Sequence, residues 1–540
     1  MINTKRYRLR LVIPAFSTFN VYSRIARQTT SSGPIYVATS ANKLEKWDVE
    51  VIDENNCKSK LCPKDKMGRP DHEQLQNDRP ADVVGFYGSL SSTVPKLFEL
   101  AAFYKERGVF TIAGGKHVEN LPEEALSNHV DIVCMREGEE TVKEILSSCS
   151  NSGNYEDIKG IAFRKEGQIF QTPPRPLITD FELYPFPDFG LLRYAKMNIY
   201  PINRTRGCNS KCEFCMVKDK SRCAGPEWMI AHIDHLVETQ NARNFFEASD
   251  HFAADREQAI EFCRLLRDYQ KQYGLRLKMT VQTRITDARY PELLQAMKEA
   301  GIHNIAIGFE SPIDEELIAM KKGYRSEDML KWTQTFHKYG FFVHGMFIFG
   351  YPQKENDCIH MELKQKVRCF KSFIKKAKID TVQLLLAIPF PGTELRKRLD
   401  NDGRIYPLDK IGWEYYDGQF PIYEPEGEVS PEELQTSVRK IMTKFYHFRN
   451  FWKITFNILF HFPRIVFLSA TTLVTFRVSY IKRAFNKWYN IYFRNYMLRF
   501  GGYFIIRSWS REFKEGDFQE KLTIAREEQK KESPRNLPKG

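Results

Sequence analysis

The chain has 540 residues, which is long for one domain and predicts roughly two to four. Its formal charge of +13 permits nucleic acid, anionic lipid or an anionic small molecule as a partner and selects none of them. No uncharged apolar run of about 18 residues occurs, so no plain transmembrane helix is predicted. The first apolar run, Leu9–Pro14, is too short for a signal peptide, and we therefore expect the protein in a reducing cytoplasm.

Residues 1–150 alternate short apolar runs with helical patterns such as Pro95–Arg107 and Glu139–Ser148. This alternation predicts an α/β domain, a Rossmann-like doubly wound parallel sheet with helices on both faces. A ligand of such a sheet binds beyond the carboxyl ends of the strands. The predicted strands are Leu9–Pro14, Val49–Asp53, Asp82–Tyr87, Val109–Ala113 and Asp131–Met135.

Small and polar residues follow three of these strands. Glycines let a ligand approach the backbone closely, and hydroxyl groups supply hydrogen bonds. For the hydroxyl run alone, an ordinary strand-to-helix turn is an equally good interpretation. The candidate ligand-binding residues are Ser89, Ser91, Thr93, Gly114, Gly115, His117, Glu137 and Gly138.

Residues 151–196 have the composition of a linker. Ile158–Arg164 and Gln168–Gln171 are typical of a hairpin. The proline-rich stretches Thr172–Pro176 and Tyr184–Pro187 favour extended chain. We therefore expect this segment to connect two domains.

A second series of alternating strands and helices begins at residue 197. Asp255 and Gln258 resemble a capping box before the helix Ala259–Tyr269, and Gly301 and Gly340 are placed just beyond helix ends. Six repeats predict a partial (βα)6 barrel over residues 197–425, with its site at the carboxyl ends of the strands. The predicted strands are Ile199–Asn203, Asn244–Ala248, Leu277–Gln282, Asn304–Gly308, Phe342–Phe349 and Thr381–Ile388.

Three cysteines, Cys208, Cys212 and Cys215, stand at C-x3-C-x2-C spacing after the first barrel strand. Thiolates are soft ligands and favour iron–sulfur clusters or zinc. A structural zinc site needs four protein ligands, and Cys223 could be the fourth, so zinc is an alternative. A [4Fe–4S] cluster on three thiolates instead leaves one iron free to bind another molecule.

This spacing, with Phe214 before the last cysteine, resembles the radical S-adenosylmethionine (SAM) superfamily, and residues 198–400 resemble its elongator-type core. The resemblance implies that the three cysteines hold a [4Fe–4S] cluster and that SAM is cleaved to a 5′-deoxyadenosyl radical. It also implies SAM contacts at the ends of the barrel strands. The expected SAM-binding residues are Phe214, Ser249, Asp250, Gln282, Arg284, Glu310, Ile388 and Pro389.

SAM carries an amino group, a carboxylate, a ribose and an adenine. Glu310 and the Ser249–Asp250 pair suit the amino group and the ribose, Arg284 suits the carboxylate, and Ile388–Pro389 suits the adenine. Two of these residues have structural alternatives. Glu310 could cap the following helix, and Arg284 could pair with Asp287.

Residues 1–150 resemble the cobalamin-binding domain of cobalamin-dependent radical SAM enzymes. The similarity rests on Ser89 and Ser91, on Gly114-Gly115-x-His117 and on Glu137-Gly138-Glu139. The usual D-x-H-x-x-G motif, whose histidine ligates cobalt, is absent. Either the cobalt has no lower histidine ligand or the domain has lost the cofactor, and His117 is not an automatic substitute.

The resemblance implies a cobalamin-dependent radical SAM enzyme that methylates an unactivated carbon of a small-molecule or lipid-like substrate and receives electrons from a flavodoxin or ferredoxin. One alternative is an oxidative cyclase or another non-methylating reaction, as in anaerobic magnesium-protoporphyrin cyclase. A second is a non-catalytic cobalamin-binding sensor. A methylthiotransferase is disfavoured because the cysteines of the first half are scattered, at Cys57, Cys62, Cys134 and Cys149. A nucleic-acid partner is disfavoured because no basic stripe lies near the site.

Residues 426–526 are predicted to be helical, beginning at Ser430, and residues 527–540 to be disordered. Within 451–506, the apolar runs Ile454–Phe462 and Ile465–Phe476 precede cations interleaved with aromatic residues. This pattern is typical of a helix in a membrane interface. Helices packed on the barrel or at a dimer contact are the slightly better interpretation, because apolar helical tails usually belong to a core. The expected location is thus the cytoplasm, with peripheral contact at the inner face of the membrane.

Overall fold

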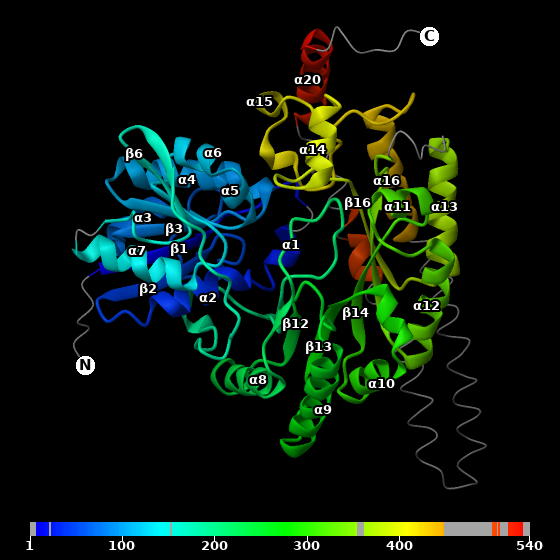
Figure 1. Ribbon diagram of the computed structural model, residues 1–540, viewed down its shortest axis with the longest axis horizontal. Helices are drawn as coiled ribbons and strands as arrows, with labels where there is room; N and C mark the ends of the chain where they lie inside the picture. Colours follow the sequence, from blue (N-terminus) through cyan, green and yellow to red (C-terminus); the bar gives the residue numbers. More distant parts are fainter. Residues whose placement is uncertain are drawn as a thin grey trace.

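The computed structural model describes residues 7–20, 23–151, 154–353, 361–447, 499–504, 506–507 and 517–532. Figure 1 shows an N-terminal α/β domain in blue and cyan beside a mainly green barrel, with α14, α15 and α20 above them. The predicted apolar runs of the 451–506 segment lie outside the described residues. Within the described ranges, no helix has the combination of length and apolar character needed to cross a bilayer.

The N-terminal sheet contains eight strands in the order β7-β6-β5-β4-β3-β1-β2-β8. The five predicted strands pair in parallel and confirm the predicted doubly wound domain, and their order is flavodoxin-like, with a switch point between β1 and β3. The strands are β1 (Tyr7–Ile13), β2 (Trp47–Asp53), β3 (Val83–Tyr87), β4 (Phe110–Gly114) and β5 (Ile132–Cys134).

Alternate residues of β1 face opposite layers of helices, because successive side chains of a strand point to opposite faces. Leu11 belongs to the core shared with α2 (Ser32–Ala41) and α7 (Glu139–Asn151), and Val12 to the core shared with α4 (Val94–Glu106). Both residues are buried. The shorter helices of the domain are α1 (Ser23–Ala26), α3 (His72–Asp78), α5 (Lys116–Asn120) and α6 (Pro122–Ser127).

The segment expected to be a linker forms both edges of the N-terminal sheet. β6 (Ile161–Lys165) and β7 (Gln168–Gln171) form the predicted hairpin, and β6 pairs antiparallel with β5. At the opposite edge, β8 (Leu192–Arg193) pairs with β2. An open strand edge leaves backbone groups unpaired, and β6 and β8 pair with the edge strands β5 and β2. The N-terminal domain therefore extends beyond the expected boundary at residue 150.

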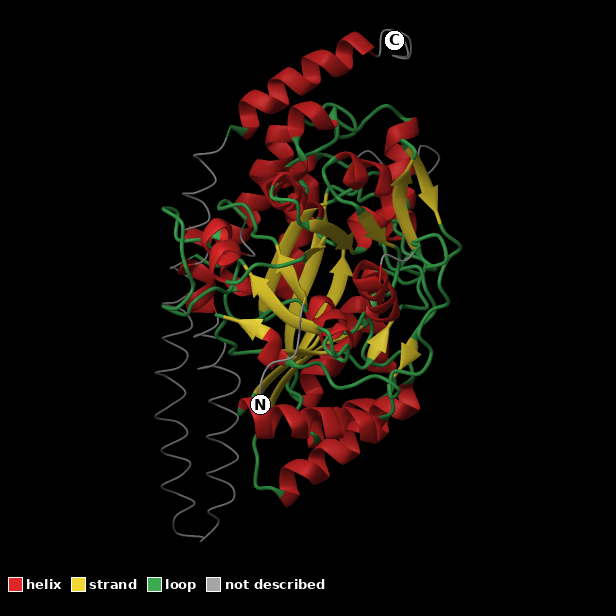
Figure 2. Cartoon of the chain, turned by 90° about the vertical axis from the view of Figure 1, so that its left-hand side faces the viewer, coloured by secondary structure: helices red, strands yellow, loops and turns green. Residues whose placement is uncertain are grey.

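The second sheet confirms the predicted partial barrel. Its six strands are parallel and follow one another in chain order, and Figure 2 shows them inside a layer of helices. They are β9 (Tyr200–Ile202), β12 (Asn244–Glu247), β13 (Lys278–Thr283), β14 (Asn304–Glu310), β15 (Phe342–Phe349) and β16 (Thr381–Leu386). The helices are α8 (Pro226–Gln240), α9 (Arg256–Gln272), α10 (Pro291–Glu299), α11 (Asp314–Ala319), α12 (Ser326–Tyr339) and α13 (Leu363–Lys376).

Local signals in the sequence set several of these helix ends. Asp255 accepts a hydrogen bond from the backbone N–H of Gln258 and begins α9, one turn earlier than expected. Gly340 ends α12 with φ of 89°, in the left-handed region that favours glycine. Ser430 accepts from the backbone N–H of Glu433 and begins the C-terminal helix α16 (Pro431–Phe445), as predicted.

The last described helix, α20 (Phe518–Glu532), corrects the prediction that disorder begins at residue 527. Phe518, Leu522 and Ala525 are buried, and Arg526 pairs with Glu424 at 2.9 Å. Their spacing places the apolar residues on one helix face, so packing against the barrel orders a charged segment. The helix lies above α14 (Glu394–Asn401) and α15 (Leu408–Ile411) in Figure 1.

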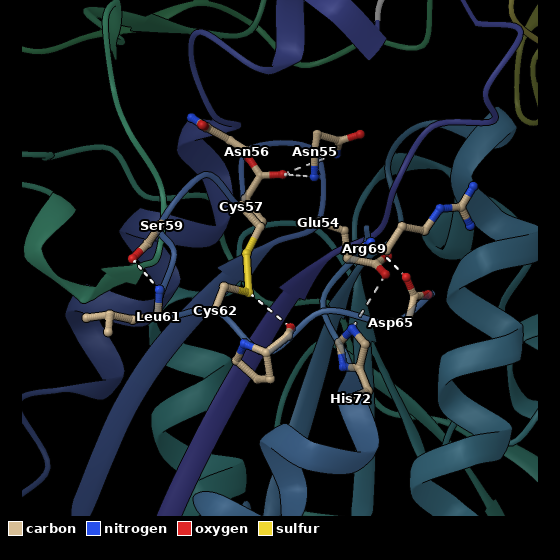
Figure 3. The surroundings of a disulfide bond; sticks show 12 residues. Glu54, Asn55, Asn56, Cys57, Ser59, Leu61, Cys62, Asp65, Arg69 and His72 are labelled. Carbon is tan, nitrogen blue, oxygen red and sulfur yellow. Dashed lines mark hydrogen bonds and ion pairs between the residues drawn. A yellow bond between two sulfur atoms is a disulfide. The ribbon is translucent and has the colours of Figure 1, made fainter. Parts of the chain in front are cut away.

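A disulfide joins Cys57 and Cys62 in the loop after β2 (Figure 3), with their Cα atoms 6.7 Å apart. No spacing in the sequence predicted a bond between these two of the scattered cysteines, and the bond differs from the expectation of a reducing compartment. The loop is also held from outside. The backbone N–H groups of Lys58 and Ser59 both donate to the carbonyl of Tyr194, at 2.9 Å.

Candidate active site

A cavity of about 450 Å³ lies between the two domains, at the carboxyl ends of strands from both sheets. This volume is in the range of small-molecule and cofactor sites, and the position is the one expected for a ligand of a doubly wound sheet. From the barrel, Gly207 and Asp250 line the cavity. From the N-terminal domain, five of the eight predicted residues line it: Ser89, Gly114, Gly115, Glu137 and Gly138.

The three-cysteine loop is the tip of a short hairpin formed by β10 (Thr205–Arg206) and β11 (Arg222–Cys223). Gly207 opens the loop with φ of 86°, and a Cβ atom there would lie 2.4 Å from the carbonyl oxygen of Lys220. Only glycine fits this turn. Its N–H donates to the carboxylate of Asp250 at 2.8 Å, so a predicted SAM ligand holds the base of the loop.

The three predicted cluster ligands differ in burial: Cys212 is buried, and Cys208 and Cys215 are half-buried. Burial raises the pKa of the Cys215 thiol, so its thiolate needs a cation nearby. Among the described side chains, no three His, Cys, Asp or Glu residues are gathered closely enough to hold a metal ion, so this structure assembles neither the expected cluster site nor the alternative zinc site. Cys223 lies on β11, with its sulfur 3.4 Å from the Thr205 hydroxyl.

Glu213 anchors the tip of the loop to the barrel, a role the sequence analysis did not predict. Its carboxylate accepts two hydrogen bonds from Arg398 of α14, at 3.0 and 2.9 Å, and one from the Tyr351 hydroxyl at 2.6 Å. Its side chain is 4% exposed. Its backbone N–H donates to Met320, and its carbonyl accepts from Leu395. The residue between two cysteines is thus fixed on both its side-chain and backbone atoms.

Glu310 ends β14 at a register shift and has φ of 61°. Its carboxylate pairs with Lys322 at 3.0 Å, and the same ammonium lies 5.8 Å from the centre of the Phe214 ring. Burial alone would lower the pKa of Lys322, but Glu310 beside it raises that pKa above its ordinary value. Ser311, rather than Glu310, accepts the N–H of Ile313 before α11, so the helix-cap alternative does not hold.

The other predicted SAM residues differ in what their polar atoms already bind. Ser249 is fully buried, and its hydroxyl accepts from the backbone of Thr205 at 2.7 Å. Arg284 donates its backbone N–H to Asp287 at 3.0 Å, and among the described residues its guanidinium forms no ion pair. The alternative pairing of Arg284 with Asp287 therefore involves only the backbone of Arg284.

Gln282 and the Ile388–Pro389 pair are the remaining predicted SAM residues, and the hydrogen bonds that hold them use their backbone carbonyls. The carbonyl of Gln282 accepts the N–H of Phe252 at 2.9 Å. Ile388 packs against a buried cluster that contains Tyr351, and the Pro389 carbonyl accepts from Arg396 at 3.4 Å. An apolar wall at the end of β16 is compatible with the expected adenine contact.

Three predicted cobalamin residues lie away from the cavity. His117 is fully buried, and its two ring nitrogens contact the Ser91 hydroxyl at 2.9 Å and the Glu124 carboxylate at 3.2 Å. Its ring meets Trp413 edge to face, with 4.6 Å between ring centres. Thr93 donates to the carbonyl of Leu90. These contacts give Ser91, Thr93 and His117 structural roles at the contact with the C-terminal region.

Glu137 joins the two domains. It accepts hydrogen bonds from Arg222 at 2.9 Å and Arg206 at 3.0 Å, both on the strands of the cysteine hairpin, and from the backbone of Ile178 at 2.7 Å. Burial raises the pKa of a carboxylate, but the hydrogen bond from Arg222 and the charge of Arg206 hold the pKa of Glu137 below its ordinary value. Glu139 adds a contact to Arg206 at 2.7 Å. The predicted cobalamin residue therefore ties the N-terminal domain to the cluster loop.

The fold and the site together define a two-domain α/β enzyme that uses bound cofactors. The B12 binding domain matches residues 25–146, and the radical SAM superfamily matches residues 202–363. The chain is therefore a radical SAM enzyme with an N-terminal B12-binding domain. Its radical SAM domain implies a [4Fe–4S] cluster and SAM, and its B12-binding domain implies cobalamin.

Two relatives in sequence are methylases by name. An uncharacterized methyltransferase of Pyrococcus horikoshii is 26% identical over 78% of this chain and 90% of its own length. The hopanoid C-2 methylase of Rhodopseudomonas palustris is 26% identical over 50% of this chain and 53% of its own length. The chain thus spans about half of the hopanoid enzyme.

Solved structures agree on the fold. The cobalamin-dependent SAM radical enzyme OxsB superposes with a TM-score of 0.62 at 15% identity, over 96% of this chain and 82% of its own. The radical SAM methyltransferase TsrM of Kitasatospora setae gives a TM-score of 0.59 at 16% identity, over 81% of this chain and 88% of its own. Likeness at this identity supports the fold alone.

Proposed function

We propose that this enzyme methylates an unactivated carbon of a small-molecule or lipid-like substrate. When bound, SAM and the cluster supply a 5′-deoxyadenosyl radical, and cobalamin supplies a methyl carrier. The observation that carries the proposal is a cavity lined by residues of both domains, including Gly114 and Gly138 on one side and Gly207 and Asp250 on the other. A methyl carrier and a radical source must reach one substrate atom, and a shared chamber permits this.

On the barrel side, we assign Cys208, Cys212 and Cys215 to the cluster and Asp250, Arg284 and Glu310 to SAM. The guanidinium of Arg284, which forms no ion pair with the described residues, suits a carboxylate, and Glu310 suits an ammonium or a hydroxyl. Lys322 belongs to the same group, because its charge compensates Glu310 before SAM binds. The main task of these side chains is to hold SAM in one orientation against the cysteine loop.

On the cobalamin side, we assign Ser89, Gly114, Gly115 and Gly138 to the cofactor, without a lower histidine ligand. Both ring nitrogens of His117 are already engaged, which supports this proposal. Protein purified without oxygen from a cobalamin-replete host should retain cobalamin whose EPR spectrum lacks histidine nitrogen splitting. Splitting that disappears in His117→Phe would overturn the assignment.

The substrate and partners are proposed from the relatives and the sequence. A hopanoid is a lipid, so a lipid-like substrate is consistent with the named relative. A small acidic electron carrier such as flavodoxin or ferredoxin would reduce the cluster. Residues 451–506, whose apolar runs lie outside the described part, would contact the membrane where such a substrate resides.

A second candidate function rests on another relative. The anaerobic magnesium-protoporphyrin IX monomethyl ester cyclase of Synechocystis is 22% identical over 62% of this chain and 66% of its own length. The same cofactors could therefore perform oxidation or ring closure. A non-catalytic sensor is disfavoured, because Arg284 and Glu310 keep charged groups at the ends of the barrel strands.

The mass of the product separates these functions. Reconstituted enzyme with a reductant and SAM carrying a labelled methyl group should be incubated with lipid extract of a strain that lacks the gene. A labelled product heavier by one methylene group supports methylation. A product lighter by hydrogen atoms supports the cyclase type of reaction, and SAM that stays intact with a complete cluster supports the sensor.

A further inference from the structure

The outer face of α13 carries a stripe of positive charge that the catalytic site does not use. Lys364, Arg368, Lys371 and Lys375 recur at intervals of four, three and four residues, which places them on one side of the helix. Neither aspartate nor glutamate occurs in α13. Lys364, Arg368 and Lys375 are exposed, and Lys371 is half-buried.

The neighbouring helix α16 adds to this charge. α13 and α16 are in contact, and Figure 1 shows them on the side of the barrel away from the N-terminal domain. Partial burial and the charges of Lys444 and Lys440 on α16 lower the pKa of Lys371. Like charges this close destabilise one another, and an anionic partner would relieve the repulsion.

The four α13 cations have no acidic partner within the described part of the chain. Its ion pairs include Lys366, which meets Glu316 at 3.1 Å and lies off the stripe, but none with Lys364, Arg368, Lys371 or Lys375. The apolar residues of the helix, such as Phe370 and Ile374, are buried in the barrel core. The helix thus keeps its place through these apolar contacts, and no acidic side chain of the described residues neutralises its four cations.

We propose that the α13–α16 face, defined by Lys364, Arg368, Lys371, Lys375 and Lys440, docks the enzyme onto an anionic lipid surface. An acidic protein would also match the charge, but the adjoining sequence favours lipid. No acidic residue occurs between Glu433 and Glu512, and the same stretch contains the apolar run Ile465–Phe476 and many aromatic residues. Cations with aromatic and apolar residues suit a bilayer interface, which attracts both kinds of group.

The surface predicts a large electrostatic contribution to binding. One Lys or Arg near an anionic leaflet changes binding about fivefold, so neutralising four should weaken it by about a hundredfold or more. Higher salt should weaken wild-type binding in the same direction, because these charges are solvent-exposed. Membrane contact through apolar residues alone would show neither effect.

Flotation of the full-length protein tests the proposal, with vesicles of phosphatidylcholine alone or mixed with phosphatidylglycerol. A variant with all four α13 cations changed to glutamine should float much less with the anionic vesicles than wild type does. The matched control changes four exposed cations on or next to α9, β13 and α10 to glutamine: Lys271, Arg276, Lys278 and Lys298. This control carries the same net charge and should float like wild type.

Circular dichroism and SAM cleavage by both variants show that the fold and the cluster are intact, so failure of docking can be distinguished from failure of the enzyme. Equal flotation of wild type and the α13 variant would overturn the proposal. Wild-type protein that does not bind anionic vesicles would also overturn it. If that protein instead binds a reduced flavodoxin-type acidic protein through the same four residues, the face is a protein-docking surface.

Discussion

Glu213 offers a sharp test of how the cysteine loop is held. Replacing it by alanine leaves the Arg398 guanidinium, 19% exposed, and the fully buried Tyr351 hydroxyl without their acceptor. Breaking a buried ion pair costs about 3–5 kcal/mol. Because Arg398 is partly hydrated and also donates to the Pro352 and Gln353 carbonyls, we expect about 2–4 kcal/mol.

Hydrogen–deuterium exchange measures this loss locally. A fall of about 2–4 kcal/mol in the free energy of local opening corresponds to roughly thirtyfold to thousandfold faster exchange in peptides covering residues 208–215 and 394–401. Glu213→Gln keeps one acceptor oxygen and should show a smaller increase. Glu394→Ala is the control, because its pair with Lys321 joins side chains that are 47% and 40% exposed and contributes about 0–1 kcal/mol.

A double-mutant cycle assigns the effect to the pair. If the contact between Glu213 and Arg398 is responsible, Glu213→Ala combined with Arg398→Met should cost less than the sum of the two single changes. Exchange in Glu213→Ala that is as slow as in wild type would refute the reasoning, since the loop would then be held by its backbone contacts alone.

Four further predictions concern the cluster, SAM, the contact between domains and pH. The triple alanine variant of Cys208, Cys212 and Cys215 should show no cluster absorbance after anaerobic reconstitution, and any remaining 5′-deoxyadenosine would contradict the assignment. Glu310→Ala should weaken SAM binding about ten- to a hundredfold in calorimetry while the cluster remains, because a charge-assisted hydrogen bond contributes about 1.5–3 kcal/mol. Glu137→Gln should speed proteolysis between the domains and leave SAM affinity unchanged; unaltered proteolysis would mean that Arg206 and Arg222 do not couple them. Burial raises the pKa of Asp417 to about 8 in the folded state, against about 4 in the unfolded state. Between about pH 4 and 8 the folded state therefore binds more protons, so the free energy of unfolding should fall as pH rises through this range. Asp417→Asn should flatten that fall in urea titrations, and an unchanged slope would exclude Asp417 as its source.

Much of the fold follows from patterns that are local in the chain. Strand periodicity and the glycine and capping signals predicted both sheets, because burial alternates along a strand and helix ends need caps. The edges were harder to predict. β8 joins β2 through two residues only, and α20 is ordered by packing on distant elements, so neither leaves a strong local pattern.

The three cysteines and the positions of the polar residues at strand ends were also available from the sequence, because a loop carries its own spacing and parallel strands bring their carboxyl ends together. The partners of those residues were decided by tertiary structure. Glu137 pairs with Arg206, 69 residues away in the chain, and Glu213 pairs with Arg398, 185 residues away. No spacing encodes such pairs. A charge in the sequence can therefore mark a site, but only the folded chain determines whether it faces a ligand, another domain or the loop that holds the cluster.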